Sequence, residues 1–372
     1  MGRLYSGTAH VELIDILAEM NCWPFYNLAR WYPSMVKLGS VPWGVGYHLT
    51  DDTGLVKTAS HMAWPYVRPS LSRFLQCHPA DVIVSFYPVT NYALMLAVRQ
   101  MRLRVPVVIV AVDMVSVHAC WFVPGAHSYL VPTEEARERA LRWHVPPERV
   151  EVVGGMPVRQ AFVEAQHLPK PEARARLGLP QEGPLVLMVG GGEGMGPLEA
   201  VIRAIAAHRP CAHLVAIAGR NRLLYERLRS LDVPVPLHVE GFVPDIEVWM
   251  RAADLLVTKA GPNALSEAFV SGLPVVLYFA LRGQEEGNVA YVLENRAGVW
   301  APRPRQAADA VMSLLADPVR RSRMAERARA LANPCAAELL GRRIWAACQN
   351  VRGVAEERAA FQFLTNSTNA RR

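Results

Sequence analysis

A sequence suited to binding an anion follows the apolar stretch 255–258. The chain continues as Lys259-Ala260-Gly261-Pro262 and then as a helix-like segment, 262–271. Proline is favoured at the first position of a helix, and the free N–H groups of a helix N-terminus bind anions. We therefore predict that Gly261 and Pro262 bind a diphosphate. Lys259 has two interpretations, a phosphate partner or a solvated lysine at a strand end, of which we favour the second.

Glu267 lies one turn further along this helix, among mostly apolar residues. A carboxylate there can accept hydrogen bonds from two vicinal hydroxyl groups, such as those of a ribose. The alternative is an ordinary exposed glutamate on a helix. The glycine-proline helix start that precedes Glu267 favours the ribose.

Three more polar residues, Gln284, Glu285 and Asn288, follow the strand-like segment 274–278. Open α/β proteins bind ligands at the carboxyl ends of their parallel strands. Amides and carboxylates without a nearby His or Cys are poor ligands for transition metals and good partners for sugar hydroxyls. We therefore expect a sugar at this place, and no metal.

A glycine-rich turn, 190–197, connects the apolar stretch 185–189 to another helix-like segment, with Pro197 suited to its first position. Glycines let the backbone approach a ligand closely. No register of the turn fits G-x-G-x-x-G and the chain has no G-x-x-x-x-G-K-[ST], so a dinucleotide-binding Rossmann site and a P-loop are disfavoured. A purely structural turn is the alternative, but the second anion-binding feature at Gly261 favours a ligand.

Strand-like and helix-like segments alternate along the chain, which is typical of parallel sheets with helices on both faces. The strand-like segments are 11–17, 81–86, 106–112, 128–131 and 149–153 in the first half, and 185–189, 214–218, 235–239, 255–258 and 274–278 in the second. They predict an α/β chain of two doubly wound, Rossmann-like domains that face each other across a cleft. The expected boundaries are 1–157 for an N-terminal domain whose first strand and loop are missing, 158–184 for a linker region, 185–352 for a C-terminal domain with Arg-rich helices, and 353–372 for a disordered tail.

The composition fits a folded protein of two domains. The chain has 372 residues, 51% of them hydrophobic and 20% charged, and one core rarely exceeds about 250–300 residues. No apolar run approaches the roughly 20 residues of a membrane-spanning helix, and no signal peptide is evident. The six cysteines show no CxxC spacing, so we expect reduced thiols rather than a metal site or disulfides.

Positive charge is concentrated toward the C-terminus. The whole chain has a net charge of +7, and the segment from Arg296 onward holds 14 arginines and six acidic residues. Such a segment could attract an anionic membrane surface, and arginines that merely solvate helices are the alternative. No aromatic residues alternate with these arginines to stack bases, so we expect no nucleic acid.

Several motifs together give the chain a specific resemblance to a known family. They are WPFYNLARWYPSMVKLG (23–39), DMVSVHACWF (113–122), VPTEEARERAL (131–141), GGMPVRQAF (154–162), GGGEGMGP (190–197), GRN (219–221), GF (241–242), KAGPN with the following SEA (259–268) and GQEEGNVAYVLENRAG (283–298). The set resembles monogalactosyldiacylglycerol synthase and its bacterial diacylglycerol glycosyltransferase relatives. These belong to the two-domain GT-B glycosyltransferases, as does the peptidoglycan N-acetylglucosaminyltransferase.

The resemblance implies that the C-terminal domain binds a UDP-sugar and that the N-terminal domain receives diacylglycerol. The implied donor-binding residues are Gly191, Gly192, Glu193, Gly194, Gly219, Phe242 and Lys259, with Gly261 and Pro262 at the diphosphate, Glu267 at the ribose, and Gln284, Glu285 and Asn288 at the hexose. On the acceptor side, Trp121 matches an aromatic residue implicated in contact with membrane lipid. His118 lies beside it, although a lone histidine is more often structural.

The activity implied is an inverting transfer of galactose, or alternatively glucose, from a UDP-sugar to diacylglycerol, by a cytoplasmic enzyme attached to the inner face of the membrane. The donor is a substrate, and no cofactor is expected. The family's GGGH turn, which carries the histidine regarded as the base, has no match, since His10 lies in a different context, and Tyr87-Pro88 replaces a His-Pro pair. The catalytic residue is therefore unassigned, and a UDP-sugar- or lipid-binding protein without catalysis is the alternative. A UDP-sugar epimerase of the same architecture is disfavoured by the motifs at 23–39 and 284–288.

Overall fold

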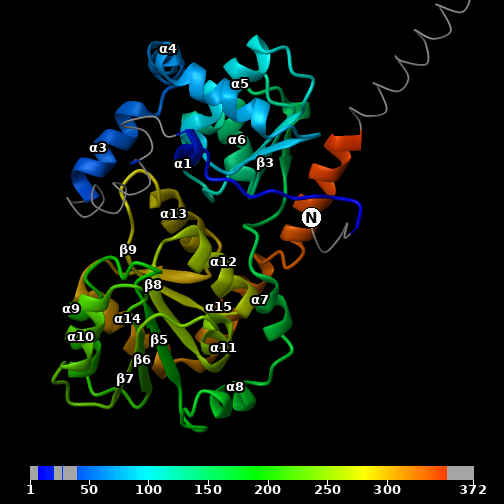
Figure 1. Cartoon of the computed structure of the whole chain (residues 1–372). Coiled ribbons are helices and arrows are strands. Elements are labelled where there is room, and N and C mark those ends of the chain that lie inside the picture. The colour runs from blue at the N-terminus through cyan, green and yellow to red at the C-terminus, as the bar shows by residue number, and fades with distance from the viewer. Residues whose placement is uncertain (1–6, 21–26, 28–39, 350–372) are drawn as a thin grey trace, which may run out of the picture. The chain divides into compact units, whose positions relative to one another are not determined.

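The computed structural model describes residues 7–20, 27 and 40–349, and these form two units (Figure 1). The first unit contains the described residues up to 112, residues 117–153 and the segment from 338 onward, and the second contains 113–116 and 154–337. Most of the motif at 23–39 and the whole of the expected tail, 353–372, lie outside the described residues.

The first unit is built on a parallel sheet in the order β1-β2-β3-β4. Every residue of β2 is buried, which is the pattern of a strand covered on both faces. The strands are β1 (Ile83–Ser85), β2 (Val107–Val110), β3 (Ser128–Val131) and β4 (Val150–Val152). The helices are α1 (Ile16–Met20), α3 (Ser40–Thr50), α4 (Thr53–Cys77), α5 (Asn91–Gln100) and α6 (Glu134–Arg142), with short 3-10 turns η2 (Pro88–Thr90), η3 (Ala119–Trp121) and η4 (Pro147–Arg149).

The strand predicted over 11–17 is wrong. Residues 9–15 have no regular structure, and the helix α1 begins at Ile16. The Asp15 carboxylate accepts hydrogen bonds from the backbone N–H groups of Leu17 (3.0 Å) and Ala18 (3.2 Å). Because such a cap satisfies the free donors of a first helical turn, it favours a helix over an isolated strand.

A helix at residues 336–349 returns to the first unit and packs on its sheet. The apolar residues that join it to the strands form one cluster: Val108, Val110, Leu130, Val153, Leu340, Ile344 and Ala347. Part of the segment 185–352, which is predicted to be the C-terminal domain, therefore completes the core of the first unit instead.

The second unit is built on a six-stranded parallel sheet in the order β10-β9-β8-β5-β6-β7. Its strands are β5 (Leu185–Val189), β6 (His213–Ile217), β7 (Leu237–Glu240), β8 (Leu255–Lys259), β9 (Val275–Phe279) and β10 (Gly298–Trp300). The first of these in the chain, β5, lies between β6 and β8, so the strand order reverses direction at the β5–β8 pair. This is the topological switch point of a doubly wound sheet.

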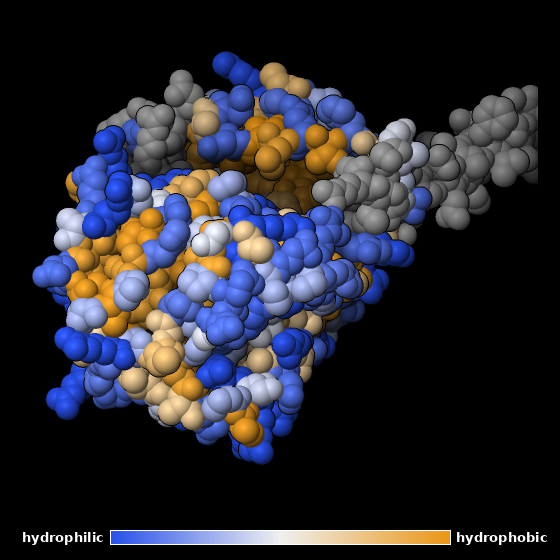
Figure 2. Space-filling view, turned by 90° about the horizontal axis from the view of Figure 1, so that it is seen from below, coloured by the Kyte–Doolittle hydropathy of each residue, from blue (hydrophilic) through white to orange (hydrophobic). Residues whose placement is uncertain are grey.

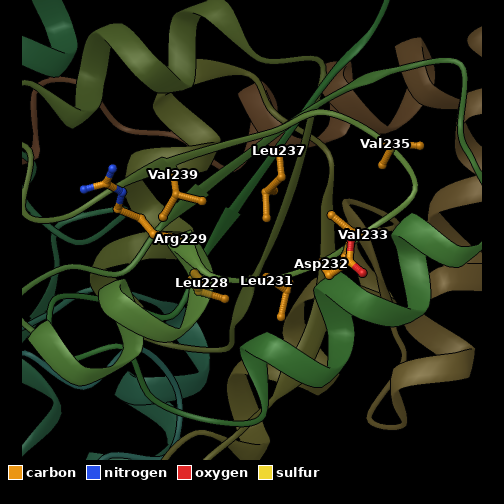
Figure 3. A pocket seen from close by; sticks show the side chains of 8 residues that line it. All are labelled: Leu228, Arg229, Leu231, Asp232, Val233, Val235, Leu237 and Val239. Carbon is orange, nitrogen blue, oxygen red and sulfur yellow. The ribbon is translucent and has the colours of Figure 1, made fainter.

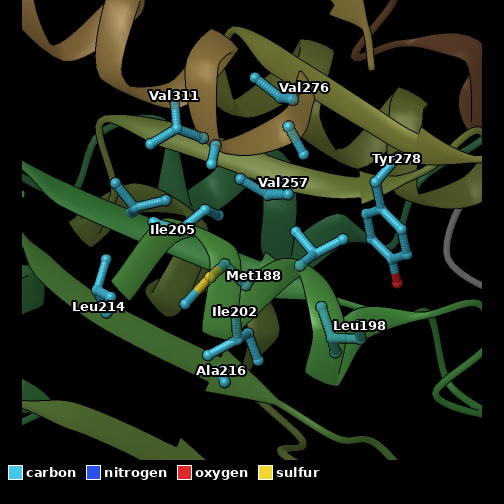
Figure 4. Packing of buried hydrophobic residues seen from close by; sticks show 14 of the residues in the cluster. Met188, Leu198, Ile202, Ile205, Leu214, Ala216, Val257, Val276, Tyr278 and Val311 are labelled. Carbon is cyan, nitrogen blue, oxygen red and sulfur yellow. The ribbon is translucent and has the colours of Figure 1, made fainter. Parts of the chain in front are cut away.

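Helices cover both faces of this sheet, with α9, α10 and α14 on one side and α7, α11 and α12 on the other (Figure 1). The core between α9, α14 and the sheet contains Ile202, Ile205, Val311, Met188 and Val257, which are all fully buried (Figure 4). The helices are α7 (Gln160–Ala165), α8 (Lys170–Arg176), α9 (Leu198–Ala207), α10 (Arg222–Arg229), α11 (Ile246–Ala252), α12 (Pro262–Ser271), α13 (Glu286–Glu294), α14 (Pro304–Ala316) and α15 (Pro318–Ala330). This packing fixes the carboxyl ends of the central strands.

The segment 158–184, expected as a linker, is folded against the second unit. It contains α7 and α8, and the buried Arg174 donates hydrogen bonds to the carbonyl of Ala252 (3.1 Å) and to the carboxylate of Asp254 (2.8 Å). Its richness in proline, glycine and charge reflects short helices and turns rather than a free connection.

The outer surface mixes hydrophilic residues with apolar patches, as the view in Figure 2 shows. None of the described helices has both the length and the apolar composition needed to cross a bilayer.

Candidate functional site

Two glycine-containing loops leave the sheet of the second unit at its switch point. β5 ends at Val189 and runs into the glycine turn 190–197, while β8 ends at Lys259 and runs into Gly261. β5 and β8 are paired, with Val189 opposite Thr258, so the two loops begin side by side. Ligands bind at this place in open α/β sheets.

The glycine turn after β5 needs glycine for its conformation. Gly191 and Gly194 have positive φ angles of 74° and 58°, and the Gly194 N–H donates to the Gly191 carbonyl (3.1 Å). A Cβ on Gly194 would lie 2.8 Å from the carbonyl oxygen of Ala218. The Tyr278 hydroxyl, whose pKa is raised by burial, donates to the carbonyl of Met195 (2.9 Å) and ties the turn to β9. Pro197 precedes α9 rather than occupying its first helical position, one residue away from the prediction.

The loop after β6 is joined to this turn through Arg220. Its backbone N–H donates to the Gly192 carbonyl (2.8 Å), and its guanidinium lies 3.4 Å from a Glu193 carboxylate oxygen and 4.8 Å from the centre of the Phe242 ring. Gly219 has no room for a side chain, since a Cβ there would lie 2.5 Å from the Gly192 oxygen. Four expected donor residues therefore meet around Arg220. Sequence reasoning missed it as a site residue, although its GRN motif was a signal.

Lys259 lies between the two loops and forms an ion pair with Glu285. Both side chains are buried, with 14% and 3% exposed, and the second oxygen of Glu285 accepts a hydrogen bond from the backbone of Leu281 (3.0 Å). A Cβ on Gly191 would lie 3.2 Å from Lys259 Cε, and a Cβ on Gly261 would lie 2.8 Å from Lys259 Nζ. The solvated lysine that we favoured is wrong, because Glu285 supplies a partner that permits burial of the charge.

The predicted helix start at Gly261 and Pro262 is confirmed. Gly261 is the N-cap of α12 and Pro262 its first residue. The free N–H groups of this first turn carry partial positive charge next to the glycine turn, and the Lys259 ammonium, whose charge is balanced by Glu285, lies beside them. An anion placed there would meet the N–H groups of α12.

Glu267, further along α12, is mostly buried rather than an exposed helix glutamate. Its pKa is raised to about 7, chiefly by burial, with Arg159 acting to lower it and Glu247 to raise it. Arg159 itself donates to the Glu247 carboxylate (2.8 Å) and to the carbonyl of Pro244 (3.0 Å). Because this carboxyl group titrates near neutrality, it only accepts hydrogen bonds above about pH 7 and can also donate one below it.

Of the three residues expected at the hexose, Gln284 alone is partly exposed. Asn288 is 1% exposed and its amide donates to the carbonyl of Ala260 (2.9 Å), so it ties α13 to the loop after β8. One carboxylate oxygen of Glu285 pairs with Lys259, and the other accepts from the backbone N–H of Leu281. Gln284 donates from Nε2 to the carboxylate of Asp113 (3.1 Å). Direct contact of all three with a sugar stays a prediction.

The two residues expected on the acceptor side are buried in the first unit. Trp121 is 1% exposed and belongs to its hydrophobic core, so the lipid contact expected of it does not agree with its position. His118 Nε2 lies 3.2 Å from the Thr50 hydroxyl and 3.3 Å from the Tyr47 carbonyl, and Nδ1 accepts from the Cys120 N–H (3.2 Å). Burial lowers the pKa of His118, opposed by Asp51. These contacts describe a structural histidine.

A separate cavity of about 250 Å³ lies between the C-terminal end of α10 and the edge strand β7 (Figure 3). Most of the residues that line it are leucines and valines, among them Leu228, Leu237 and Val239. None of the expected donor residues lines it, so this cavity is not part of the candidate donor site.

The sequence matches two family descriptions. Residues 2–158 match "Monogalactosyldiacylglycerol (MGDG) synthase", and residues 169–331 match "Glycosyl transferases group 1".

Solved structures support the predicted fold. The MurG protein of Acinetobacter baumannii has a TM-score of 0.57 at 18% identity, with 77% of this chain and 80% of MurG covered. The MnaA protein of S. aureus, solved with UDP, has a TM-score of 0.57 at 16% identity, covering 77% and 79%. At such low identity the likeness concerns the fold alone, and it confirms the predicted GT-B class with its two parallel sheets.

Curated relatives are more similar in sequence. A probable monogalactosyldiacylglycerol synthase of Nicotiana tabacum is 35% identical over 81% of this chain, and the enzyme of Spinacia oleracea is 34% identical over 81%. The chain spans 57% and 59% of the length of these two proteins. It is also 35% identical to a probable monogalactosyldiacylglycerol synthase 2 of Oryza sativa, over 82% of this chain and 67% of the rice protein. The chain therefore belongs to the monogalactosyldiacylglycerol synthase family.

Proposed function

We propose that this protein transfers galactose from UDP-galactose to diacylglycerol and so makes a glycolipid. The observation that carries the proposal is the helix start at the switch point of the second unit, where α12 begins at Gly261 and Pro262 and Lys259 lies close to both Gly191 and Gly261. The names of the relatives in tobacco, spinach and rice supply the sugar and the lipid.

The site fits the leaving group of such a transfer. As the acceptor hydroxyl attacks the anomeric carbon, it gives up its proton to a base that is unassigned here, the bond from that carbon to the diphosphate breaks, and negative charge grows on the diphosphate oxygens. Preorganised N–H groups and a fixed cation stabilise that charge without having to reorganise. The first turn of α12 supplies such N–H groups, with the Lys259 ammonium held beside it by Glu285, and the sugar carbon inverts because attack comes from the opposite side.

A transfer assay tests the proposal. The purified chain is incubated with radiolabelled UDP-galactose or UDP-glucose and diacylglycerol in mixed micelles, and lipid products are separated by thin-layer chromatography. We expect a galactolipid, with less product from UDP-glucose, and a loss of activity in Lys259→Met. A folded sample that binds UDP and yet makes no glycolipid from either donor would contradict the proposal.

We further propose that the protein binds a membrane surface through α3. This helix has no Asp, Glu, Lys or Arg, and its residues Val41, Val45 and Leu49 follow one another at intervals of four with 50%, 55% and 71% of their surface exposed. Such spacing places them on one side of the helix, and an apolar stripe of this kind suits the interfacial region of a bilayer. The following helix α4 contains no acidic residue, so it does not repel an anionic surface.

The Arg-rich C-terminal segment, expected to attract the membrane, supports that role less. Arg342 pairs with Glu338 and Arg343 with Glu151, and Arg321 donates to the carbonyl of Leu314 (2.8 Å). Four of the 14 arginines lie outside the described residues.

Flotation with liposomes tests α3 as the membrane contact. We expect Leu49→Ser to reduce the fraction that floats with phosphatidylglycerol-containing vesicles, because about 1–2 kcal/mol of apolar burial is lost. Leu223→Ser on α10 is the matched control, since Leu223 is 74% exposed and Leu49 is 71% exposed. Equal flotation of both variants and the parent would rule out α3 as the contact.

A further inference from the structure

A short segment, residues 113–116, belongs to the second unit, although the residues on both sides of it in the chain belong to the first. It follows β2 in the chain and yet packs with the second unit. The Asp113 carboxylate accepts a hydrogen bond from Gln284 Nε2 (3.1 Å), and the Ser116 hydroxyl accepts one from the Gly287 N–H (3.1 Å). The segment therefore holds the loop before α13 and the first turn of that helix.

Gly287 makes this close approach possible. A Cβ on Gly287 would lie 2.5 Å from Ser116 Oγ and 2.7 Å from Val115 Cγ1, which is closer than atoms tolerate. Any larger residue would push the segment 113–116 away from α13, and the hydrogen bond between Asp113 and Gln284 would lengthen with it.

The contact fixes which way the Gln284 amide faces. An ionised carboxylate only accepts hydrogen bonds, whereas an amide has one end that donates and one that accepts. Asp113 therefore requires Nε2 of Gln284 on its side, and Oε1 points the other way. The neighbouring residue Glu285 is fixed independently, by Lys259 and the backbone of Leu281.

We propose that Asp113 is a positioning residue for the sugar of the donor: it orients the Gln284 amide so that Oε1 accepts a hydrogen bond from a hexose hydroxyl. This inference rests on the proposed function, because it takes the hexose of a UDP-sugar to lie at Gln284. Asp113 acts through Gln284 and does not itself touch the sugar.

Binding of UDP and of UDP-galactose to the full chain, measured by calorimetry, tests this role. In Asp113→Ala we expect the Kd for UDP-galactose to rise about tenfold, the effect of one lost hydrogen bond, while the Kd for UDP stays within about twofold. Asp113→Asn keeps a carbonyl oxygen at the same place and should restore most of the affinity. Ser116→Ala is the matched control, because it removes the second hydrogen bond of the segment and leaves the Gln284 amide oriented.

Equal losses for UDP and UDP-galactose in Asp113→Ala would overturn the proposal, since they would mean a general disturbance of the unit. Unchanged binding of both would overturn it as well. If Asp113→Ala fails to fold, as judged by thermal melting, Gln284→Leu and Gln284→Glu replace it, and the same selective loss for UDP-galactose is expected. Because no lipid acceptor is present, these results stand apart from the transfer assay, and either proposal can fail alone.

Discussion

Replacing Glu267 by glutamine should change how the stability of the protein depends on pH. The carboxyl of Glu267 has a pKa of about 7 in the folded protein against 4.5 as its ordinary value, chiefly because of burial. Below pH 4.5 the carboxyl is protonated in both the folded and the unfolded chain, and the stability contributed by the protonated form is fully present. This stability is lost as the pH rises through about 7, because the unfolded chain ionises above about pH 4.5 whereas the folded protein ionises only near pH 7.

The size of the effect follows from the two pKa values. A separation of this size corresponds to about 3 kcal/mol when the pH is well above 7, and about 2–3 kcal/mol should develop between pH 5 and pH 8.5. Glutamine cannot ionise, so Glu267→Gln should be close to the parent in stability at pH 5 and more stable at pH 8.5. Urea-induced unfolding across this pH range measures the difference.

The same variant tests the ribose assignment. Ribose hydroxyls donate most strongly to an ionised carboxylate, so the affinity of the parent for UDP should increase as the pH rises through about 7. Glu267→Gln should bind UDP about 1–3 kcal/mol more weakly at pH 8, with little dependence on pH. Glu294→Gln, at an exposed glutamate of α13, serves as the control. Parallel stability curves for the parent and Glu267→Gln would refute the reasoning about burial.

Two further predictions concern the loops at the switch point. Lys259→Met leaves the buried Glu285 carboxylate without its partner and should lower the free energy of unfolding in urea by about 3–5 kcal/mol. The double variant Lys259→Met/Glu285→Gln should recover most of that loss. A single variant Lys259→Met as stable as the parent would show that the pair is not buried in solution. Gly219→Ala should destabilise the protein by at least about 1–3 kcal/mol and weaken UDP binding, because its φ of 65° and the Gly192 oxygen exclude a side chain. Gly241→Ala, where the nearest atom would be 3.8 Å away, should stay within about 0.5 kcal/mol, and equal thermal shifts in the two variants would contradict this account.

Features that depend on neighbours in sequence could be predicted from the sequence. The helix start at Gly261 and Pro262 is an example, because the residues that define it are adjacent and proline has few alternatives. The alternation of strands and helices in the second unit is another, since its central strands are short, largely apolar runs bounded by turns.

Features that depend on distant partners could not be predicted. The partner of Lys259 is 26 residues away, and the partner of Gln284 is 171 residues away. Trp121 gives no local sign of its burial, because a tryptophan suits a core and a lipid surface equally well. The prediction of a strand over 11–17 is wrong because the apolar alternation there is short and the cap at Asp15 favours a helix.

The helix at 336–349 has a consequence for how the protein is made. Its apolar face completes the sheet of the first unit, although that sheet is otherwise formed from residues before 154. On a ribosome, which makes the N-terminal part first, the strands β2 and β3 emerge long before the residues that cover them. The second unit, almost continuous in sequence, can fold as it emerges. The first unit stays incomplete through most of synthesis, which makes its sheet the part of the nascent chain most in need of protection from aggregation.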